Sequence, residues 1–191
     1  RRPTRTSADL TALLEAGLVP RNAALRLAVC PGSTACSNAF TNSRALAEVL
    51  SQQLADAANG EPGQPLRIRV SGCTNGCALH VMADIGLEGL AQRRDGALIP
   101  AYRLWLGGRA HQQHSRLATD LGIIPARLVA DCVADVVSVY QRDRRSDEGL
   151  AALLDRIGVE PFAAVMQRHQ KSGDMRALMT DVGDQAPYRA Q

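Results

Sequence analysis

Four cysteines occur as two short pairs, and their spacing is the feature of the chain most directly tied to chemistry. Cys30 and Cys36 bound the segment CPGSTAC, and Cys73 and Cys77 bound CTNGC. Soft thiolate ligands match iron and sulfide, so four that meet at one point can occupy the corners of a cubane 4Fe-4S cluster. The two pairs therefore favour an iron–sulfur site.

Two other uses of four cysteines remain open. Zinc knots use gaps of about two to four residues and usually recruit histidine, and oxidised chains pair their cysteines as disulfides. The gaps of five and three residues fit zinc poorly. The odd fifth cysteine and a basic N-terminus without a signal-like apolar core favour metal ligation in the cytoplasm over a disulfide framework. Cys132 has apolar helical spacing, which predicts a buried core thiol.

The elements around the cysteines indicate how the pairs are positioned. Residues 25–30 and 66–73 are both predicted to be strands that end on a cysteine. A helix over 44–58 follows the first pair, with a cap supplied by the residues at 41–43. Its N-terminus is then expected to lie near an anionic cluster, where a helix dipole is favourable. Both cysteine pairs are predicted to lie in turns that begin at strand ends.

The rest of the chain completes an α+β domain in which a mixed sheet is flanked by helices. Patterning predicts a strand at 101–108 and helices at 125–143, 147–158 and 160–171. From Ser172 onward the periodicity is lost, so partial disorder is expected there. We expect residues 25–171 to form the cofactor domain and residues 172–191 to form a C-terminal tail.

Composition excludes two classes of function. The 191 residues are 46% hydrophobic and 21% charged, with no apolar run long enough for a membrane span. The formal net charge is only +3 and aromatic residues make up 3% of the chain. Scattered arginines with few stacking aromatics argue against nucleic-acid binding. We therefore expect neither a membrane nor a nucleic acid among the partners.

Three segments carry a resemblance to a known family. CPGSTACSNAFTNSR, RIRVSGCTNGCALHVMADIGLEG and YRLWLGG resemble the cluster-binding C-terminal half of the sirohaem-dependent sulfite and nitrite reductases, over about residues 25–165. The resemblance implies the nitrite/sulfite reductase 4Fe-4S domain fold. It also implies a 4Fe-4S cluster on all four cysteines, with Cys77 shared as axial ligand to the sirohaem iron. Residues 1–24 are then the end of a preceding ferredoxin-like half or a linker. Because the chain lacks an initiator methionine, an upstream portion of the enzyme is expected.

The resemblance also implies a reaction, the six-electron reduction of sulfite to sulfide or of nitrite to ammonia. The expected partners are a ferredoxin or flavoprotein electron donor, a small inorganic anion as substrate, and the N-terminal half of the same enzyme. In the family that half supplies most cationic anion-binding residues, so no catalytic residue is assigned in this chain. Two alternatives remain: an enzyme like oxygen-dependent precorrin-3B synthase, which acts in cobalamin biosynthesis, and a non-catalytic iron–sulfur electron-transfer module.

Residues near the second cysteine pair have smaller expected roles. Asn75 and Gly76 are short enough to let a macrocycle approach. Asn75 either bonds a sulfur or a sirohaem carboxylate, or serves as a left-handed turn residue. His80 is expected to be packed or hydrogen-bonded and not a ligand. Asp84 is expected to organise a turn or cap. Leu79 stands where the family often has a polar residue.

The remaining polar candidates are treated as surface residues by default. His111 and His114 lie in a polar stretch that predicts a solvated loop. Family members must neutralise the sirohaem carboxylates somewhere, and four arginines are candidates for this role beside their default place on the surface: Arg44, Arg67, Arg69 and Arg103.

Overall fold

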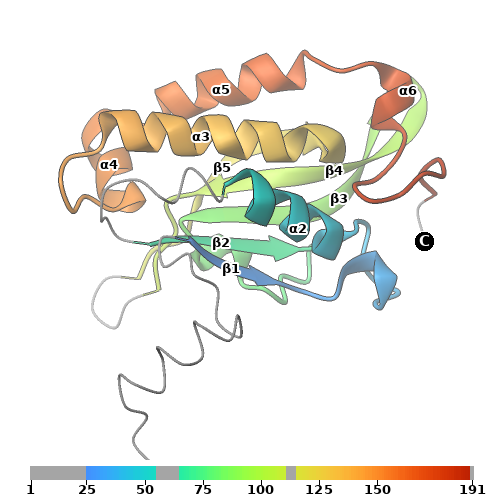
Figure 1. Ribbon diagram of the computed structural model, residues 1–191, viewed down its shortest axis with the longest axis horizontal. Helices are drawn as coiled ribbons and strands as arrows, with labels where there is room; N and C mark the ends of the chain where they lie inside the picture. Colours follow the sequence, from blue (N-terminus) through green and yellow to red (C-terminus); the bar gives the residue numbers. More distant parts are fainter. Residues whose placement is uncertain (1–24, 55–64, 111–114, 190–191) are drawn as a thin grey trace, which may run out of the picture.

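A five-stranded mixed sheet organises the computed structural model, which describes residues 25–54, 65–110 and 115–189 (Figure 1). The strands lie in sequence order, β1-β2-β3-β4-β5. The pairs β1/β2 and β2/β3 are parallel, and β3/β4 and β4/β5 are antiparallel. The strands are β1 Leu25–Val29, β2 Leu66–Ser71, β3 Ile85–Arg94, β4 Ala97–Leu106 and β5 Thr119–Pro125.

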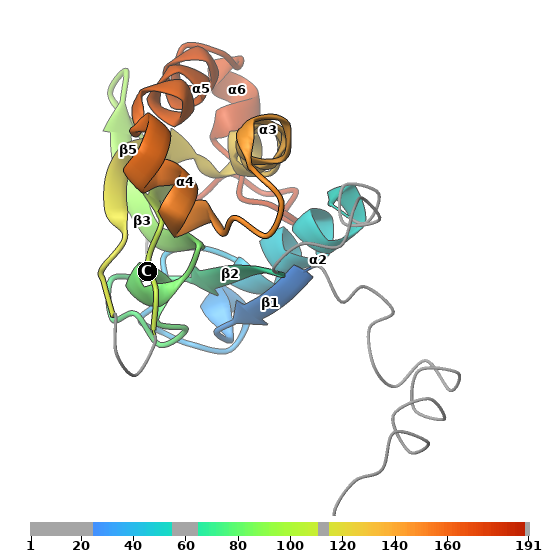
Figure 2. The same cartoon turned by 90° about the vertical axis from the view of Figure 1, so that its left-hand side faces the viewer.

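The longer helices lie together on one side of this sheet (Figure 2). They are α2 Ser43–Gln53, α3 Val129–Asp143, α4 Leu150–Ile157 and α5 Glu160–Gln170, with a short α6 at Met175–Leu178. Three 3-10 turns complete the described elements: η1 Gly32–Thr34, η3 His80–Met82 and η4 Ala126–Leu128. The predicted α+β fold with a mixed sheet and flanking helices is confirmed. None of the helices in the described ranges has the length and apolar character needed to cross a bilayer.

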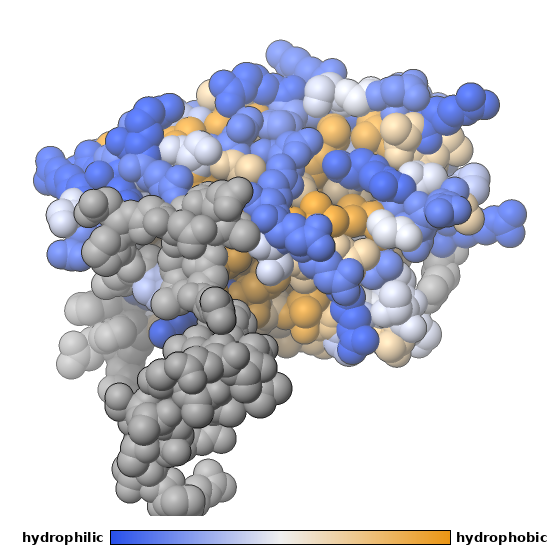
Figure 3. Space-filling view, in the orientation of Figure 1, coloured by the Kyte–Doolittle hydropathy of each residue, from blue (hydrophilic) through white to orange (hydrophobic). Residues whose placement is uncertain are grey.

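The two faces of the sheet differ because side chains alternate along each strand. In β2, Ile68 and Val70 are fully buried in the hydrophobic core, whereas Arg67 and Arg69 on the other face are half-buried. The core packs α2, α3 and α5 onto the apolar face through residues such as Leu46, Leu50, Ile85, Leu104, Val133 and Phe162. On the outer surface in Figure 3, hydrophilic residues line the upper edge and hydrophobic residues show near the middle.

Three predicted strands are present, and two strands were missed. Residues 25–30, 66–73 and 101–108 correspond to β1, β2 and β4, and β4 begins four residues earlier, at Ala97. The first five residues of β3 are all buried, so this strand shows no period-two alternation. β5 contains Gly122 at φ +106, and its pairing with β4 includes a register shift. Such an irregularity interrupts the alternation of buried and exposed residues, so β5 was missed as well.

The predicted helices α2 to α5 are present. Helix α2 begins at Ser43, and Oδ1 of Asn42 accepts the Ala45 N–H over 3.1 Å as its N-terminal cap. The predicted extension of this helix to residue 58 lies outside the described residues. So do residues 1–24, to which the sequence assigned the end of a preceding domain or a linker.

The expectation of a partly disordered tail was wrong for residues 172–189. Leu178 and Val182 are buried, and the Asp181 carboxylate accepts the Asn42 N–H over 2.6 Å. The Arg127 guanidinium donates to the Thr180 hydroxyl over 2.8 Å. Isolated side chains hold this segment in place, so it has no periodic pattern from which its packing could be predicted.

Candidate iron–sulfur site

The first cysteine of each pair follows one of two neighbouring parallel strands. Val29 at the end of β1 pairs with Val70 near the end of β2, so both strands deliver their following residues to the same edge of the sheet. The Cys30 N–H donates to the Val70 carbonyl over 3.0 Å. The Gly72 N–H donates to the Cys30 Sγ over 3.0 Å. The thiol of Cys30 therefore touches the residue directly before Cys73.

The two cysteine-bearing turns also pack on each other. The Gly72 carbonyl accepts the N–H groups of Phe40 and Thr41 over 2.7 and 3.2 Å. A Cβ placed on Gly72 would lie 2.9 Å from the Thr41 carbonyl oxygen and 3.1 Å from the Cα of Gly32. Only a residue without a side chain allows this approach. Glycine at position 72 thus brings the first turn against the second.

The N-terminus of α2 lies beside Cys30, as the sequence predicts. The Ser43 hydroxyl donates to the Cys30 carbonyl over 2.9 Å, and its oxygen lies 3.4 Å from the Cys30 Sγ. The first turn of a helix presents unpaired N–H groups and a partial positive charge. This environment favours a negatively charged group at the sulfur of Cys30.

The cysteines differ in how far solvent reaches them. Cys73 is buried, Cys30 and Cys36 are partly exposed, and Cys77 is exposed. The turn before Cys77 is made by Gly76 at φ +69, a conformation in which glycine is favoured. Asn75 is exposed and is not among the residues with positive φ, so the left-handed role considered for it was wrong.

The free thiols narrow the alternatives for this site. All five cysteines are unpaired, so the disulfide alternative was wrong. In the parts of the chain that the structure describes, no three His, Cys, Asp or Glu side chains are grouped closely enough to hold a single metal ion, as a zinc knot requires. A cubane spreads its ligands further apart because each thiolate binds a different iron. Two packed turns with free thiols and an N–H donor to sulfur fit such a group.

Cys132 lies away from these turns and is the buried core thiol that its helical spacing predicts. It is fully buried in α3, and its S–H lies 3.5 Å from the Met166 Sδ. Burial in an apolar environment raises the pKa of the Cys132 thiol to about 12. It is therefore protonated at neutral pH and cannot act as a thiolate ligand in this state.

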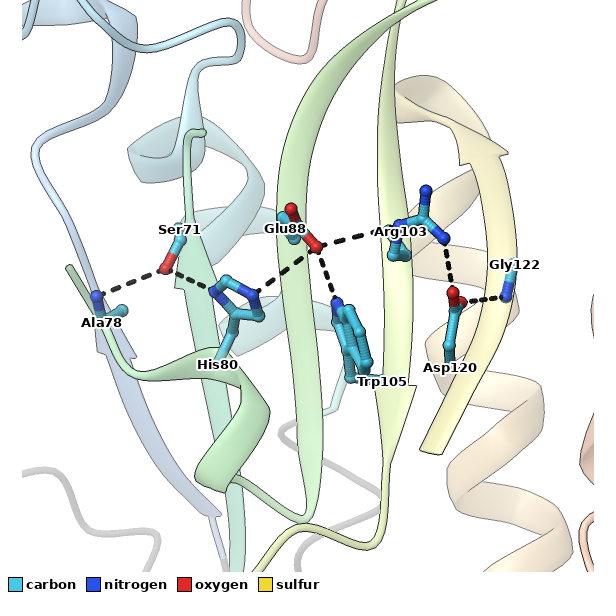
Figure 4. Close-up of polar contacts among 8 residues, drawn as sticks. All are labelled: Ser71, Ala78, His80, Glu88, Arg103, Trp105, Asp120 and Gly122. Atoms are coloured by element: carbon cyan, nitrogen blue, oxygen red, sulfur yellow. Dashed lines mark hydrogen bonds and ion pairs between the residues drawn. The ribbon is translucent and has the colours of Figure 1, made fainter. Parts of the chain in front are cut away.

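A buried polar cluster adjoins the turn of the second cysteine pair (Figure 4). The His80 Nδ1 lies 3.0 Å from the Ser71 Oγ, and its Nε2 lies 3.6 Å from the Glu88 Oε2. The Trp105 indole donates to the same carboxylate oxygen over 2.9 Å. Burial lowers the pKa of His80, and the nearby Glu88 charge opposes this only in part. His80 is thus neutral at pH 7, and the expectation of a packed, hydrogen-bonded histidine is confirmed.

Sequence reasoning missed the three partners of His80, namely Ser71, Glu88 and Trp105. They come from β2, β3 and β4, so their meeting depends on strand register. Ser71 is paired with Glu88, and Glu88 is paired with Arg103. The one available signal was a carboxylate inside the apolar run IGLEGL, because a charge is seldom buried without partners.

The candidate arginines mostly have partners within the chain. The Arg67 guanidinium binds both oxygens of Asp84, over 2.9 and 3.0 Å, and this contact raises the pKa of Arg67. Asp84 also accepts the Arg67 backbone N–H over 2.9 Å, so it ties β2 to the start of β3. The expectation that Asp84 organises a turn or cap was wrong.

The other three arginines lie on different parts of the domain. Arg103 is paired with Asp120, and Arg69 donates to the Ala78 carbonyl over 3.2 Å. Arg44 is exposed on α2. His111 and His114 lie outside the described residues. The contacts therefore join the two cysteine-bearing turns, with the His80 cluster beside the second turn.

Comparison with known proteins shows the family to which the chain belongs. The family model of the nitrite and sulphite reductase 4Fe-4S domain matches residues 22–172. The sulfite reductase (NADPH) hemoprotein beta-component of Bordetella petrii is 32% identical over 83% of this chain and 26% of that protein. The assimilatory ferredoxin-dependent nitrite reductase of Haloferax mediterranei is 27% identical over 70% of this chain and 23% of that protein. The chain thus spans about a quarter of the length of these relatives.

Solved structures agree on the fold. Mycobacterium tuberculosis NirA superposes with a TM-score of 0.65 at 23% identity, over 79% of this chain and 30% of that one. Dissimilatory sulfite reductase I superposes with a TM-score of 0.59 at 12% identity, over 78% of this chain. With the family match over most of its length, the chain belongs to the nitrite and sulphite reductase 4Fe-4S domain family.

Proposed function

We propose that this chain is the cofactor-holding part of a sirohaem-dependent reductase of sulfite or nitrite. Four thiolates would hold a 4Fe-4S cluster: Cys30, Cys36, Cys73 and Cys77. The observation that carries the proposal is the hydrogen bond from the Gly72 N–H to the Cys30 Sγ, because it joins the two cysteine turns at one edge of the sheet. In a cluster-bound protein this N–H would donate to a sulfur that ligates iron.

The exposure of Cys77 supports a second role for its sulfur. A group that lies partly outside this chain can reach Cys77, whereas Cys73 is buried. We assign Cys77 as the thiolate shared between the cluster and the sirohaem iron, with Asn75 and Gly76 as close neighbours of the macrocycle. When bound, the coupled pair supplies electron storage beside an open iron coordination site. The part of this chain would be to hold both groups through Cys77.

The electron donor and the substrate follow from the relatives' names and from the part of the enzyme outside this chain. Two of the relatives are named for ferredoxin or NADPH dependence, so we propose a ferredoxin or flavoprotein donor. The substrate is a small inorganic anion, sulfite or nitrite. Cationic groups that bind it come in this proposal from the N-terminal half of the enzyme, since Arg67 and Arg103 are already paired with carboxylates.

The test is an anaerobic preparation of this chain together with any upstream portion encoded with it. The account predicts iron and sulfide in the protein, and a tetrapyrrole with an intense Soret band and long-wavelength bands. It also predicts reduction of nitrite or sulfite by a chemically reduced donor. A cluster spectrum without tetrapyrrole would replace the proposal with an electron-transfer module. Bound sirohaem without reduction of either anion would contradict the proposed reaction.

A further inference from the structure

We propose that Ser71 and His80 are positioning residues for Cys77, acting through the hydrogen bonds that join Ala78, Ser71 and His80, with the Glu88 carboxylate facing the His80 ring. This inference rests on the proposed function of Cys77 as a cofactor ligand. Neither residue touches the cofactor in this scheme. They fix the peptide group that follows Cys77, and through it the direction of the exposed thiol.

The residue after Cys77 is held by β2 at both of its backbone polar groups. The Ala78 N–H donates to the Ser71 Oγ over 3.3 Å, and the Ala78 carbonyl accepts from the Arg69 guanidinium over 3.2 Å. The next residue, Leu79, has a left-handed backbone at φ +56 and a side chain that is 58% exposed. A non-glycine residue in this region is strained and persists only where its surroundings hold it. The two bonds to Ala78 supply such a constraint.

The carboxylate that faces His80 favours one direction for these contacts. Ser71 has a single hydroxyl hydrogen, and its oxygen accepts the Ala78 N–H. The Ser71 Oγ lies 3.0 Å from the His80 Nδ1, and its hydrogen donates to Nδ1 when that nitrogen carries no proton. The Glu88 carboxylate can only accept, and its Oε2 faces the His80 Nε2 at 3.6 Å (Figure 4), so a ring proton on Nε2 is favoured in neutral His80.

Trp105 and Arg103 hold the Glu88 carboxylate in place beside His80. Its Oε2 accepts the Trp105 indole N–H over 2.9 Å, and the Arg103 Nε lies 3.8 Å away. The three side chains in this series of contacts are nearly inaccessible to solvent: Ser71 is 1%, His80 is 4% and Glu88 is 9% exposed. Water cannot readily replace a partner that is removed, so a buried polar group left behind costs stability or shifts the turn. These contacts are thus suited to hold the turn after Cys77 in one conformation.

Ser, His and Glu in this order also suggest a hydrolytic triad, but burial rules out that chemistry. A nucleophilic hydroxyl must meet its substrate, and the Ser71 hydroxyl is enclosed and already engaged with Ala78. A positioning role uses the same contacts without requiring access.

The first test is the tautomer of His80, measured by nitrogen-15 NMR on the intact protein prepared without metal. The proposal predicts the Nε2–H form at pH 7, identified by assignment against His80→Phe. A dominant Nδ1–H form would show that His80 donates to Ser71, opposite to the direction proposed. This measurement does not depend on whether the protein binds a cluster.

The second test uses variants of the reconstituted full-length protein. Ser71→Ala and His80→Phe should each speed the loss of cluster absorbance to a chelator by about tenfold, the size typical for partners of metal ligands. The double variant should lose the cluster at the same rate as each single variant, because both substitutions break the same series of hydrogen bonds. His80→Asn places an amide oxygen near the position of Nδ1 and should restore most of the wild-type rate.

The matched control is His169→Phe, which removes another histidine–carboxylate pair, the one with Asp135 at 2.8 Å between α5 and α3. It should leave the rate of cluster loss unchanged. Wild-type rates in both Ser71→Ala and His80→Phe, with a stable cluster in the wild type, would overturn the inference alone. Failure of the wild type to take up iron would instead overturn the proposed function.

Discussion

The backbone N–H of Gly72 donates a hydrogen bond to the sulfur of Cys30 over 3.0 Å, across 42 positions of sequence. This contact joins two turns that each carry one pair of cysteines. It exists because β1 and β2 are parallel and adjacent, so their carboxyl ends lie together. The sheet thereby converts two distant sequence motifs into one local arrangement of free thiols.

Gly72→Ala should separate these turns. The added Cβ would meet the Thr41 carbonyl at 2.9 Å, and overpacking of this kind costs about 1–3 kcal/mol of folding free energy. We expect a lower midpoint in urea unfolding and reduced iron content after reconstitution. Gly96→Ala is the control: its φ of +81 is strained, but it has no neighbour within 4 Å. An iron content in Gly72→Ala equal to that in the control would contradict this account of the turns.

Asp181→Asn tests the contact between the C-terminal segment and α2. The carboxylate accepts the N–H groups of Asn42 and Val182 over 2.6 and 2.7 Å, and an amide can accept with only one atom. We expect a loss of about 1–2 kcal/mol in the free energy of unfolding at pH 7. Asp184→Asn, at an exposed side chain, should change this value by less than about 0.5 kcal/mol. Equal effects of the two variants would refute the role of Asp181.

The pH dependence of Asp181 has a defined sign. Burial raises the pKa of Asp181 in the folded protein, although two backbone N–H bonds oppose the shift. The folded state therefore binds this proton more tightly than the unfolded state. As pH rises from about 4, the ordinary aspartate value, the stability of the wild type relative to Asp181→Asn should fall, and then level off above the folded pKa. Urea unfolding at several pH values measures the difference, and a rising difference would contradict the assignment.

The fifth cysteine should behave differently from the other four in protein without metal. Because burial raises the pKa of Cys132 to about 12, iodoacetamide at pH 8 should leave it unmodified while it labels the exposed Cys77. Mass spectrometry of the digested protein reads out each site. Labelling of Cys132 at the rate of Cys77 in the folded protein would show that the thiol is accessible.

Asp84→Asn should weaken the link between β2 and β3. The carboxylate holds the guanidinium and the backbone N–H of Arg67, and both side chains are largely shielded from solvent. We expect a loss of about 1–3 kcal/mol in the free energy of unfolding. The comparison is Asp155→Asn, which breaks a more exposed ion pair with Arg116 and should cost less than about 1 kcal/mol. If both variants lost the same amount, Asp84 would be an ordinary surface partner.

Local patterns were sufficient to predict the elements that deliver the cysteines. The alternation in β2 and the cap of α2 at Asn42 depend on nearby residues, so the sequence carries them directly. The cluster around His80 could not be predicted in this way. Ser71 and Glu88 meet through the register of β2 and β3, and no local pattern encodes which residues of two strands stand opposite each other.

The same distinction explains the other errors. Asp84 was expected at a turn or cap because its type favours such positions, but the neighbouring strand supplies Arg67 as a partner. Asp181 stands in an aperiodic segment, and its contact with Asn42 spans 139 positions. Contacts of this range follow from the assembled fold and not from local propensity.

The central claim is that four thiolates hold one iron–sulfur cluster, and metal analysis of cysteine variants tests it most directly. Anaerobically reconstituted wild type and Cys132→Ala should each contain about four iron and four sulfide per chain. Replacement by serine at Cys30, Cys36, Cys73 or Cys77 should lower both values sharply, with the folded state checked by circular dichroism. Unchanged iron in all four variants, or zinc in place of iron and sulfide, would contradict the account.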